Sequence, residues 1–224
     1  MDDNEAMNRI RILLADDHAI LREGIRALLE DQPDMVVVGE AADGRRAVEL
    51  ACELTPDVVV MDIGMPLLNG LEATRQIKHD CPQVAVLVLT MHDNEEYVSK
   101  VLAEGAAGYV LKRAASSELV TAIRAVAAGQ SYLSPSVTRL LIESYVGRQP
   151  AAPAVVDPFD TLTAREREVL QLVAEGYTNS QIASLLNISL KTVKAHRSNL
   201  MQKLGLHDRG DLIKLAIQRG IIEV

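Results

Sequence analysis

Five short, almost wholly apolar segments recur in the first part of the chain, and amphipathic stretches separate them. The apolar segments cover residues 10–15, 35–40, 58–62, 84–90 and 108–111. Their side chains do not alternate between polar and apolar, which is typical of parallel strands covered by helices on both faces. The stretches between them, for example around Leu21, Ile25 and Leu28, carry apolar residues at helical spacing. Five βα units therefore predict a doubly wound α/β domain with a parallel sheet.

The pattern changes after Gly129. Residues 135–146 are predicted to form a helix with a proline in its first turn. Residues 147–158 hold three prolines among small residues, which is typical of a semi-stiff linker. We therefore expect a first domain at residues 9–128, a helix and interdomain linker at 129–157, and a second domain at 158–224.

The second domain shows no strand pattern, and good helix N-caps recur along it. Thr163 and Thr178 each precede a Glu or Gln by three residues, the spacing of a capping box. Ser189 and Asp208 are further N-caps. These signals predict an all-α domain of four helices, at about 163–175, 179–186, 190–204 and 208–218.

The formal charge of −8 is unevenly distributed along the chain. Residues 1–159 hold 14 Lys and Arg against 24 Asp and Glu, a net charge of −10. Residues 160–224 hold 9 against 7, a net charge of +2, and the 32 residues from 176 to 207 contain no acid. The acidic total argues against a nucleic-acid-binding protein, but the second domain by itself is compatible with one.

Several classes of protein are excluded by composition. No apolar run approaches the ~18 residues of a membrane span, and the acidic N-terminus does not resemble a signal peptide. Cys52 and Cys81 are too few for a disulfide framework, so we expect both to be reduced thiols. The expected location is the cytoplasm, without membrane association.

Charged and polar side chains stand where the predicted strands end. Asp16 and Asp17 follow the first strand, Asp62 ends the third, Thr90 ends the fourth, and Lys112 follows the fifth. Because the carboxyl ends of parallel strands meet at one edge of the sheet, we expect these side chains to lie together. Three carboxylates repel one another, and a cation that prefers oxygen ligands, such as Mg²⁺ or Mn²⁺, would relieve that repulsion. A carboxylate beside that cation and Lys112 is well placed to attack a phosphoryl group.

Ordinary turn chemistry also explains each of these residues singly. An Asp-Asp pair after a strand is often a solvated turn or a helix N-cap, and Lys112 alone would be read as a surface lysine. The co-occurrence of all five at strand ends favours a functional cluster.

Residues 16–18, 62–70 and 105–112, together with Thr90, resemble the receiver domain of two-component response regulators over about residues 9–128. The resemblance implies a flavodoxin-like sheet of five strands in the order 2-1-3-4-5. It also implies that Asp62 accepts a phosphoryl group from a sensor histidine kinase. Mg²⁺ would be held by Asp16, Asp17, Asp62 and the backbone carbonyl of Gly64.

The same resemblance assigns the switch residues. Lys112 would pair with the phosphate, Thr90 would move to bond the new phosphoryl oxygen, and Tyr109 would turn inward behind it. Phosphorylation adds roughly −1.5 to −2 charge, and these movements report it to the surrounding surface. Gly64 departs from the family pattern, because this position often carries a side chain that tunes the lifetime of the phosphate.

Residues 189–204 form a helix with two distinct faces when placed at 100° per residue. Val193, Leu200 and Leu204 fall together and are predicted to face the core. The opposite face is small and basic, as a helix that enters the DNA major groove requires, and the short helix before it predicts a helix-turn-helix. The alternative is a solvated helix with ordinary lysines. Arg197 lies beside the core stripe, so it fits a structural role as well as DNA contact, and His196 is equally ambiguous.

Residues 162–170, 175–179, 182–183, 192–196 and 203–205 resemble the LuxR-type DNA-binding domain, and both halves together resemble a NarL/FixJ-class response regulator. The resemblance implies base contacts around Lys194, Ala195 and Ser198. It also implies contacts to the DNA backbone from Lys191 and Thr192, with His196 and Arg197 as further candidates. The last helix would mediate dimerisation of the DNA-binding domain.

The leading hypothesis is therefore a phosphorylation-switched transcription regulator and not an enzyme. Phosphorylation of Asp62 would favour domain release, homodimerisation and binding to double-stranded DNA. One alternative is a Mg²⁺-dependent phosphohydrolase with Asp62 as nucleophile, although such enzymes usually have a second acid at the position of Gly64. Another is a domain with a purely structural pocket, whose DNA binding is controlled by protein partners.

Overall fold

The computed structural model describes residues 9–91, 93, 95–147 and 157–222. The chain divides into two compact units, which for the most part hold residues 1–149 and 150–224. The predicted linker at 147–158 lies largely outside the described residues. Among the residues that are described, no helix is both long and apolar enough to cross a membrane.

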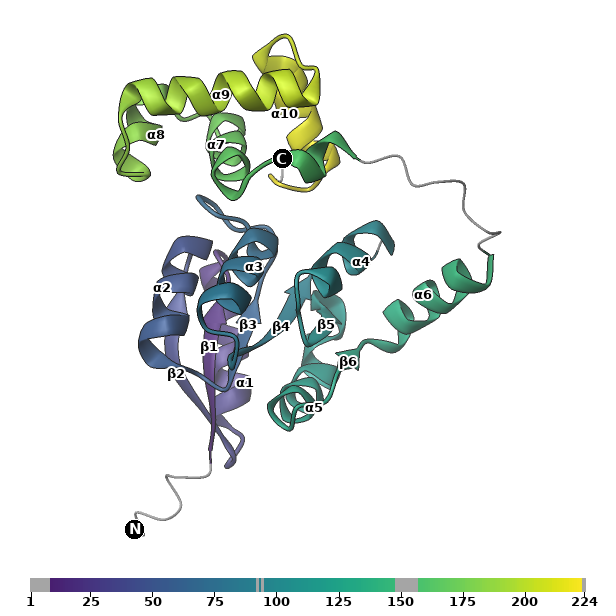
Figure 1. Cartoon of the computed structure of the whole chain (residues 1–224). Helices are drawn as coiled ribbons and strands as arrows, with labels where there is room; N and C mark the ends of the chain where they lie inside the picture. The colour runs from purple at the N-terminus through teal and green to yellow at the C-terminus, as the bar shows by residue number, and fades with distance from the viewer. Residues whose placement is uncertain (1–8, 92, 94, 148–156, 223–224) are drawn as a thin grey trace. The chain divides into compact units, whose positions relative to one another are not determined.

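A single parallel sheet organises the first unit (Figure 1). Its strands lie in the order β2-β1-β3-β4-β5-β6, which confirms the predicted order 2-1-3-4-5 and adds a sixth strand at the edge. The strands are β1 (Ile10–Ala15), β2 (Met35–Ala41), β3 (Val58–Met61), β4 (Ala85–Thr90), β5 (Gly108–Leu111) and β6 (Tyr132–Leu133).

The sixth strand was not predicted, because its two residues are too short to show a pattern. Its backbone nevertheless pairs with β5. The N–H of Tyr132 donates a hydrogen bond to the carbonyl of Ala107 at 3.1 Å. The N–H of Ser134 donates to the carbonyl of Tyr109 at 3.0 Å. The pairing therefore depends on the edge that β5 presents and not on local sequence.

Helices cover both faces of the sheet (Figure 1). The helices of this unit are α1 (Ala19–Glu30), α2 (Gly44–Leu54), α3 (Gly70–Asp80), α4 (Glu95–Ala103), α5 (Ala115–Ala127) and α6 (Pro135–Gly147). Ile12 and Leu14 of β1 pack in one apolar core with α1 and α5. Leu13, between them, points to the other face, where α2 and α3 run side by side. All four residues of β3 are buried, as expected for a central strand covered on both faces.

The prediction that Cys52 and Cys81 are reduced thiols is wrong for this structure, because the two cysteines form a disulfide. Cys52 is exposed in the last turn of α2, and Cys81 follows α3 directly and is buried. The packing of α2 against α3 brings the Cα atoms of Cys52 and Cys81 to within 5.8 Å of each other. Nothing in a sequence separation of 29 residues indicates this approach.

The second unit is helical, as predicted. It contains a short 3₁₀ helix (Pro158–Thr161) followed by α7 (Ala164–Ala174), α8 (Asn179–Leu185), α9 (Leu190–Leu204) and α10 (Arg209–Gln218). Both predicted capping boxes, at Thr163 and Thr178, are formed. Val193 and Leu200 of α9 are fully buried in the core of this unit.

Gly70, the first residue of α3, tests how closely α3 packs against the end of β3 in the first unit. A Cβ at Gly70 would lie 1.9 Å from the backbone carbonyl oxygen of Asp62, so Gly70→Ala forces the backbone to move. We expect this change to lower the free energy of unfolding by about 2–3 kcal/mol. Gly24 is the matched control, because it lies exposed inside α1 with nothing within 4 Å of a new Cβ. Gly24→Ala should stabilise by roughly 0.5–1 kcal/mol.

Thermal melting followed by circular dichroism measures both variants. Opposite signs are expected for Gly70→Ala and Gly24→Ala. Equal melting temperatures for wild type and Gly70→Ala would show that the close approach to Asp62 is absent in solution.

Candidate functional site

The predicted acidic cluster forms at the carboxyl edge of the sheet. Asp16 and Asp17 follow β1, and Asp62 follows β3. Ligand atoms of Asp16, Asp17, His18 and Asp62 all lie within 4.8 Å of one another. Asp16 and Asp62 are each 4% exposed, whereas Asp17 reaches solvent. The cluster therefore has a buried floor and one open side.

Lys112 connects the two buried carboxylates. Its Nζ lies 2.6 Å from Oδ2 of Asp62 and 2.9 Å from Oδ2 of Asp16. Burial raises the pKa of Asp62, and the charge of Asp16 acts in the same direction, while Lys112 opposes both. Burial acts to lower the pKa of Lys112, but the two carboxylates outweigh it and raise that pKa. The lysine is thus held as a cation among groups that carry excess negative charge.

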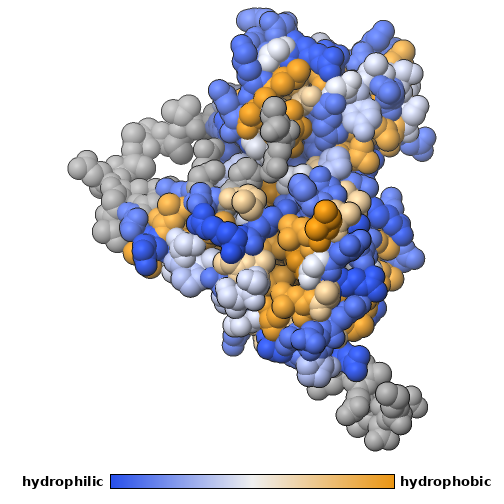
Figure 2. Space-filling view, turned by 180° about the vertical axis from the view of Figure 1, so that it is seen from behind, coloured by the Kyte–Doolittle hydropathy of each residue, from blue (hydrophilic) through white to orange (hydrophobic). Residues whose placement is uncertain are grey.

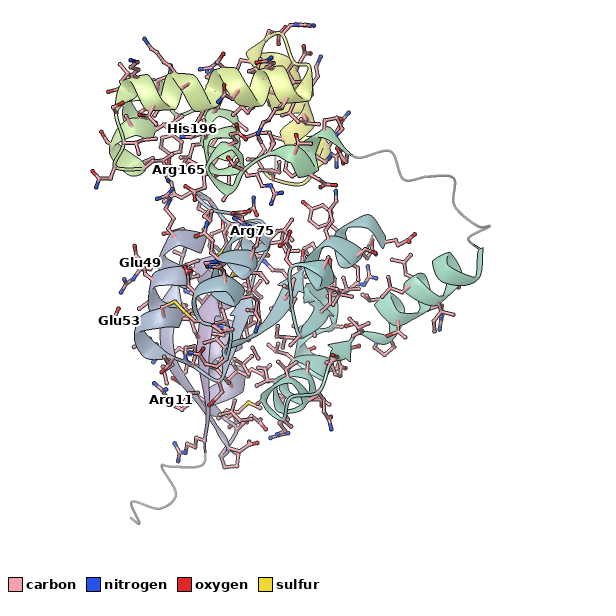
Figure 3. All side chains as sticks on the ribbon, in the orientation of Figure 1. Arg11, Glu49, Glu53, Arg75, Arg165 and His196 are labelled. Carbon is pink, nitrogen blue, oxygen red and sulfur yellow. A yellow bond between two sulfur atoms is a disulfide. The ribbon has the colours of Figure 1, made fainter. Side chains whose placement is uncertain are left out.

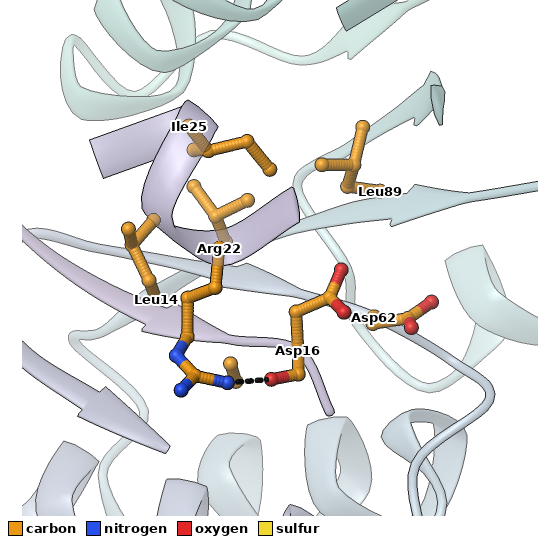
Figure 4. A pocket seen from close by; sticks show the side chains of 8 residues that line it. Leu14, Asp16, Arg22, Ile25, Asp62 and Leu89 are labelled. Carbon is orange, nitrogen blue, oxygen red and sulfur yellow. Dashed lines mark hydrogen bonds between the residues drawn. The ribbon is translucent and has the colours of Figure 1, made fainter. Parts of the chain in front are cut away.

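Backbone groups and one arginine fix the acidic residues in place. The N–H of Gly64 donates to the carboxylate of Asp62, and the N–H of His18 donates to Oδ1 of Asp16 at 2.8 Å. Arg22 of α1 donates from Nη1 to the backbone carbonyl of Asp16 at 2.6 Å, and its Nε pairs with Glu40 at 2.8 Å. Figure 4 shows the hydrogen bond from Arg22 to Asp16 beside a small pocket between α1 and the sheet.

Two of these residues were not assigned a role from the sequence. His18 belongs to the Asp16-Asp17-His18 motif, and its Nδ1 lies 2.8 Å from Oδ1 of Asp17 and 3.3 Å from Oδ1 of Asp16. The spacing of His18 in the motif could have signalled it. No local pattern marks Arg22, because Arg22 lies in α1 and its partner Glu40 lies 18 residues away on β2.

The donor set of the cluster fits a hard divalent cation. Three carboxylates supply oxygen ligands, and Oδ2 of Asp16 is buried without a donor in hydrogen-bonding geometry among the described residues. Lys112 lies near that oxygen, but one ammonium neutralises only part of the charge of three carboxylates. The cluster can therefore hold a metal ion, and Mg²⁺ is the cation that combines few carboxylates with room for phosphate oxygens.

Thr90 and Tyr109 lie together beneath the same edge of the sheet. Thr90 ends β4 and is 1% exposed, and Tyr109 on β5 is fully buried. Burial raises the pKa of Tyr109, the charges of Tyr97 and Asp93 add to this effect, and a hydrogen bond with Thr90 opposes it. Tyr109 is therefore a neutral phenol whose inward position is already coupled to Thr90.

Exposed apolar side chains flank the acidic cluster. Ile20, in the first turn of α1, is 88% exposed, and Met91, directly after Thr90, is 65% exposed. Figure 2 shows apolar areas among hydrophilic ones on one face of the molecule. Large exposed apolar side chains beside a functional site are typical of protein–protein contact.

The second predicted site lies on α8 and α9, which form the helix-turn-helix. Asn187 between them adopts the left-handed conformation, with φ of 51°, and allows the tight turn. The side chain of Ser189 accepts a hydrogen bond from the N–H of Thr192 at 3.0 Å and starts α9. Of the predicted DNA contacts, Lys191, Lys194, Ala195 and Ser198 are exposed, and Thr192, His196 and Arg197 are half-buried.

Other basic residues of the second unit are engaged in its own packing. Nη1 of Arg197 lies 3.3 Å from Oδ1 of Asn179 at the start of α8, which supports the structural interpretation of Arg197. Lys203 pairs with the buried Glu166 at 2.7 Å and donates to the carbonyl of Thr161 at 3.0 Å. Figure 3 shows His196 on α9 and Arg165 on α7 within this unit. Not every cation of the acid-free stretch is therefore available to DNA.

Comparison with known families agrees with both halves of the chain. Residues 12–124 match the response regulator receiver domain. Residues 160–216 match the bacterial regulatory proteins of the luxR family.

Known proteins resemble the chain over its full length. It is 41% identical to the transcriptional regulatory protein DegU of Brevibacillus brevis, with 100% of both chains covered. It is also 41% identical to the oxygen regulatory protein NreC of Staphylococcus carnosus, covering 96% of this chain and 100% of NreC. The solved RcsB response regulator of Salmonella typhimurium is 33% identical, with a TM-score of 0.59, and the match covers 95% of this chain and 100% of RcsB.

The folds of the two units, the family matches and the relatives agree with one another. The comparisons place the chain in a non-enzymatic class of DNA-binding regulators. The chain belongs to the NarL/FixJ class of response regulators, the transcriptional regulators of two-component systems that join a receiver domain to a LuxR-type DNA-binding domain.

Proposed function

We propose that Asp62 is the phosphoryl acceptor of this regulator and that its phosphorylation controls DNA binding. The observation that carries the proposal is the bridge of Lys112 between Asp62 and Asp16 inside a cluster that can hold a metal ion. A carboxylate oxygen of Asp62 would attack the phosphorus of a phosphohistidine. The P–N bond breaks as the O–P bond forms, and the imidazole of the kinase leaves.

Each residue of the cluster has a defined task in this proposal. Asp16, Asp17, Asp62 and the carbonyl of Gly64 would hold Mg²⁺, which neutralises charge on the phosphoryl oxygens when it is bound. Lys112 supplies a second, fixed positive charge, with its Nζ 2.6 Å from Oδ2 of Asp62. The hydroxyl of Thr90, which contacts Tyr109, then bonds the new phosphoryl oxygen and transmits the change.

The partners follow from the two sites. A sensor histidine kinase would dock where Ile20 and Met91 expose apolar surface beside the cluster. Double-stranded DNA would be bound by α9, with base contacts from Lys194, Ala195 and Ser198 and backbone contacts from Lys191, Thr192 and His196.

The phosphorylated form would be a homodimer in which α10 pairs the two DNA-binding domains. The chain would act in the cytoplasm. The proposed domains span residues 9–128 and 158–224, joined by 129–157.

Replacement of Asp62 by Asn tests the acceptor directly. Asp62→Asn should lose labelling by a small phosphodonor completely, because an amide oxygen is a poor nucleophile. Intact mass spectrometry after incubation with acetyl phosphate and Mg²⁺ measures the gain of one phosphoryl group. Asp80→Asn is the matched control, because Asp80 is an exposed carboxylate at the end of α3 and should leave labelling unchanged. Stoichiometric labelling of Asp62→Asn would falsify the assignment.

Mg²⁺ should stabilise the receiver through the same cluster. At ten times its dissociation constant, a ligand that binds only the folded state adds about 1.4 kcal/mol, which raises the melting temperature of a chain of this size by roughly 2–6 °C. Asp17→Asn should remove most of this shift. The shift should also shrink as the pH falls toward the raised pKa of Asp62, because protons then compete with the metal. An equal shift in wild type and Asp17→Asn would contradict the proposed ligand set.

Alanine variants of α9 test the DNA contacts separately. Lys194→Ala should weaken binding to a selected DNA site by about 1–3 kcal/mol and relax its sequence preference. Lys191→Ala should weaken specific and random DNA equally and reduce the salt slope by about one. Fluorescence anisotropy of the full chain, with and without Mg²⁺ and a phosphoryl mimic, measures all of these effects. Unchanged affinity on addition of the mimic would contradict the switch.

A further inference from the structure

The disulfide of the first unit lies away from every site described above. Cys52 lies in the last turn of α2, just before β3, and Cys81 lies between α3 and β4. Both cysteines therefore stand at the amino edge of the strands, whereas Asp62 stands at the carboxyl edge. Figure 3 shows the sulfur–sulfur bond beside α2, close to Glu53. The proposed phosphorylation chemistry uses neither cysteine.

The two cysteine residues differ in their exposure to solvent. Cys52 is exposed, and Cys81 is only 3% exposed. A separation of 5.8 Å between the Cα atoms is within the usual range for a disulfide, so the backbone positions of α2 and α3 in this structure suit the bond. The exposed cysteine is the one that a small solute would meet first, and the buried one is its bonded partner.

The fold does not need this bond as a staple. The sheet has its own apolar core, in which α1 and α5 pack on the side chains of β1 and β3. Small domains depend on disulfides mainly when they lack such a core. Disulfides in which one cysteine is exposed are the kind that small thiols can reduce, which is typical of regulatory disulfides.

We propose that Cys52 and Cys81 form a reversible redox modification site whose oxidant is a low-molecular-weight disulfide. The thiolate of Cys52 attacks one sulfur of the small disulfide, which breaks its S–S bond and releases one small thiol. The thiolate of Cys81 then attacks Sγ of Cys52 and releases the second small thiol. Two protein thiols are oxidised, one small disulfide is reduced to two thiols, and a small thiol in excess reverses both steps.

The oxidised state adds a constraint to the segment that carries Asp62. The bond ties the end of α2 to the end of α3 and encloses β3 in a covalent loop. Such a loop restricts the unfolded chain and stabilises the folded one. We therefore expect the oxidised protein to melt several degrees higher than the reduced protein.

The test uses the full chain, equilibrated with oxidised or reduced glutathione, quenched with acid, denatured and alkylated. Reduced wild type should gain two alkyl groups, and oxidised wild type should gain none while remaining a monomer on a non-reducing gel. Cys81→Ala should trap one glutathione on Cys52 because the resolving thiol is gone. Cys52→Ser should form the adduct at least tenfold more slowly, because Cys81 is buried. The melting temperature of the variant that carries both Cys52→Ser and Cys81→Ala should be the same in oxidised and reduced glutathione.

Three results would overturn the proposal. The first is two alkyl groups on wild type after oxidation, and the second is a disulfide-linked dimer in place of the internal bond. The third is equal adduct formation on Cys81→Ala and Cys52→Ser. Because masses and melting temperatures are the readouts, none of these results depends on the assignment of Asp62 as phosphoryl acceptor.

Discussion

The burial of Lys112 between Asp16 and Asp62 is the interaction on which the receiver site depends. Two carboxylates and one ammonium are withdrawn from water at the carboxyl edge of the sheet, and Asp17 adds a third carboxylate at its open side. Taking charges out of water is costly unless they are paired, and Lys112 offsets part of that cost by pairing with both buried carboxylates. The remaining negative charge leaves a cluster that could hold a further cation.

The rest of the first unit holds this cluster in place. Parallel strands that are buried on both faces bring Asp16 and Asp62 from positions 46 residues apart to one edge. Gly70 allows α3 to start against the carbonyl of Asp62, and Arg22 fixes the backbone of Asp16 from α1. The geometry of the site is thus supported by backbone contacts as much as by its charged side chains.

Much of this arrangement could be predicted from local pattern. The strands were recognisable as apolar runs, and the helices of the second unit from their caps, because both signals depend on neighbouring residues. What the pattern missed depends on contacts between distant segments. β6 exists because β5 offers an edge, and Lys203 is engaged because Glu166 is buried beside it. Arg22 of α1 is held beside Asp16 because Glu40 of β2 pairs with it.

The sequence by itself indicated the two-part organisation, the order of the main elements and the candidate residues for phosphate chemistry and DNA contact. Periodicity, capping and charge distribution are properties of short stretches, so they can be read without coordinates. Only the tertiary structure decided which of those residues meet. In the structure Lys112 pairs with Asp16 and Asp62, Arg197 contacts Asn179, and Cys52 is bonded to Cys81. The geometry of these contacts could not be predicted from the sequence, because distances between helices and strands are set by core packing and not by spacing along the chain.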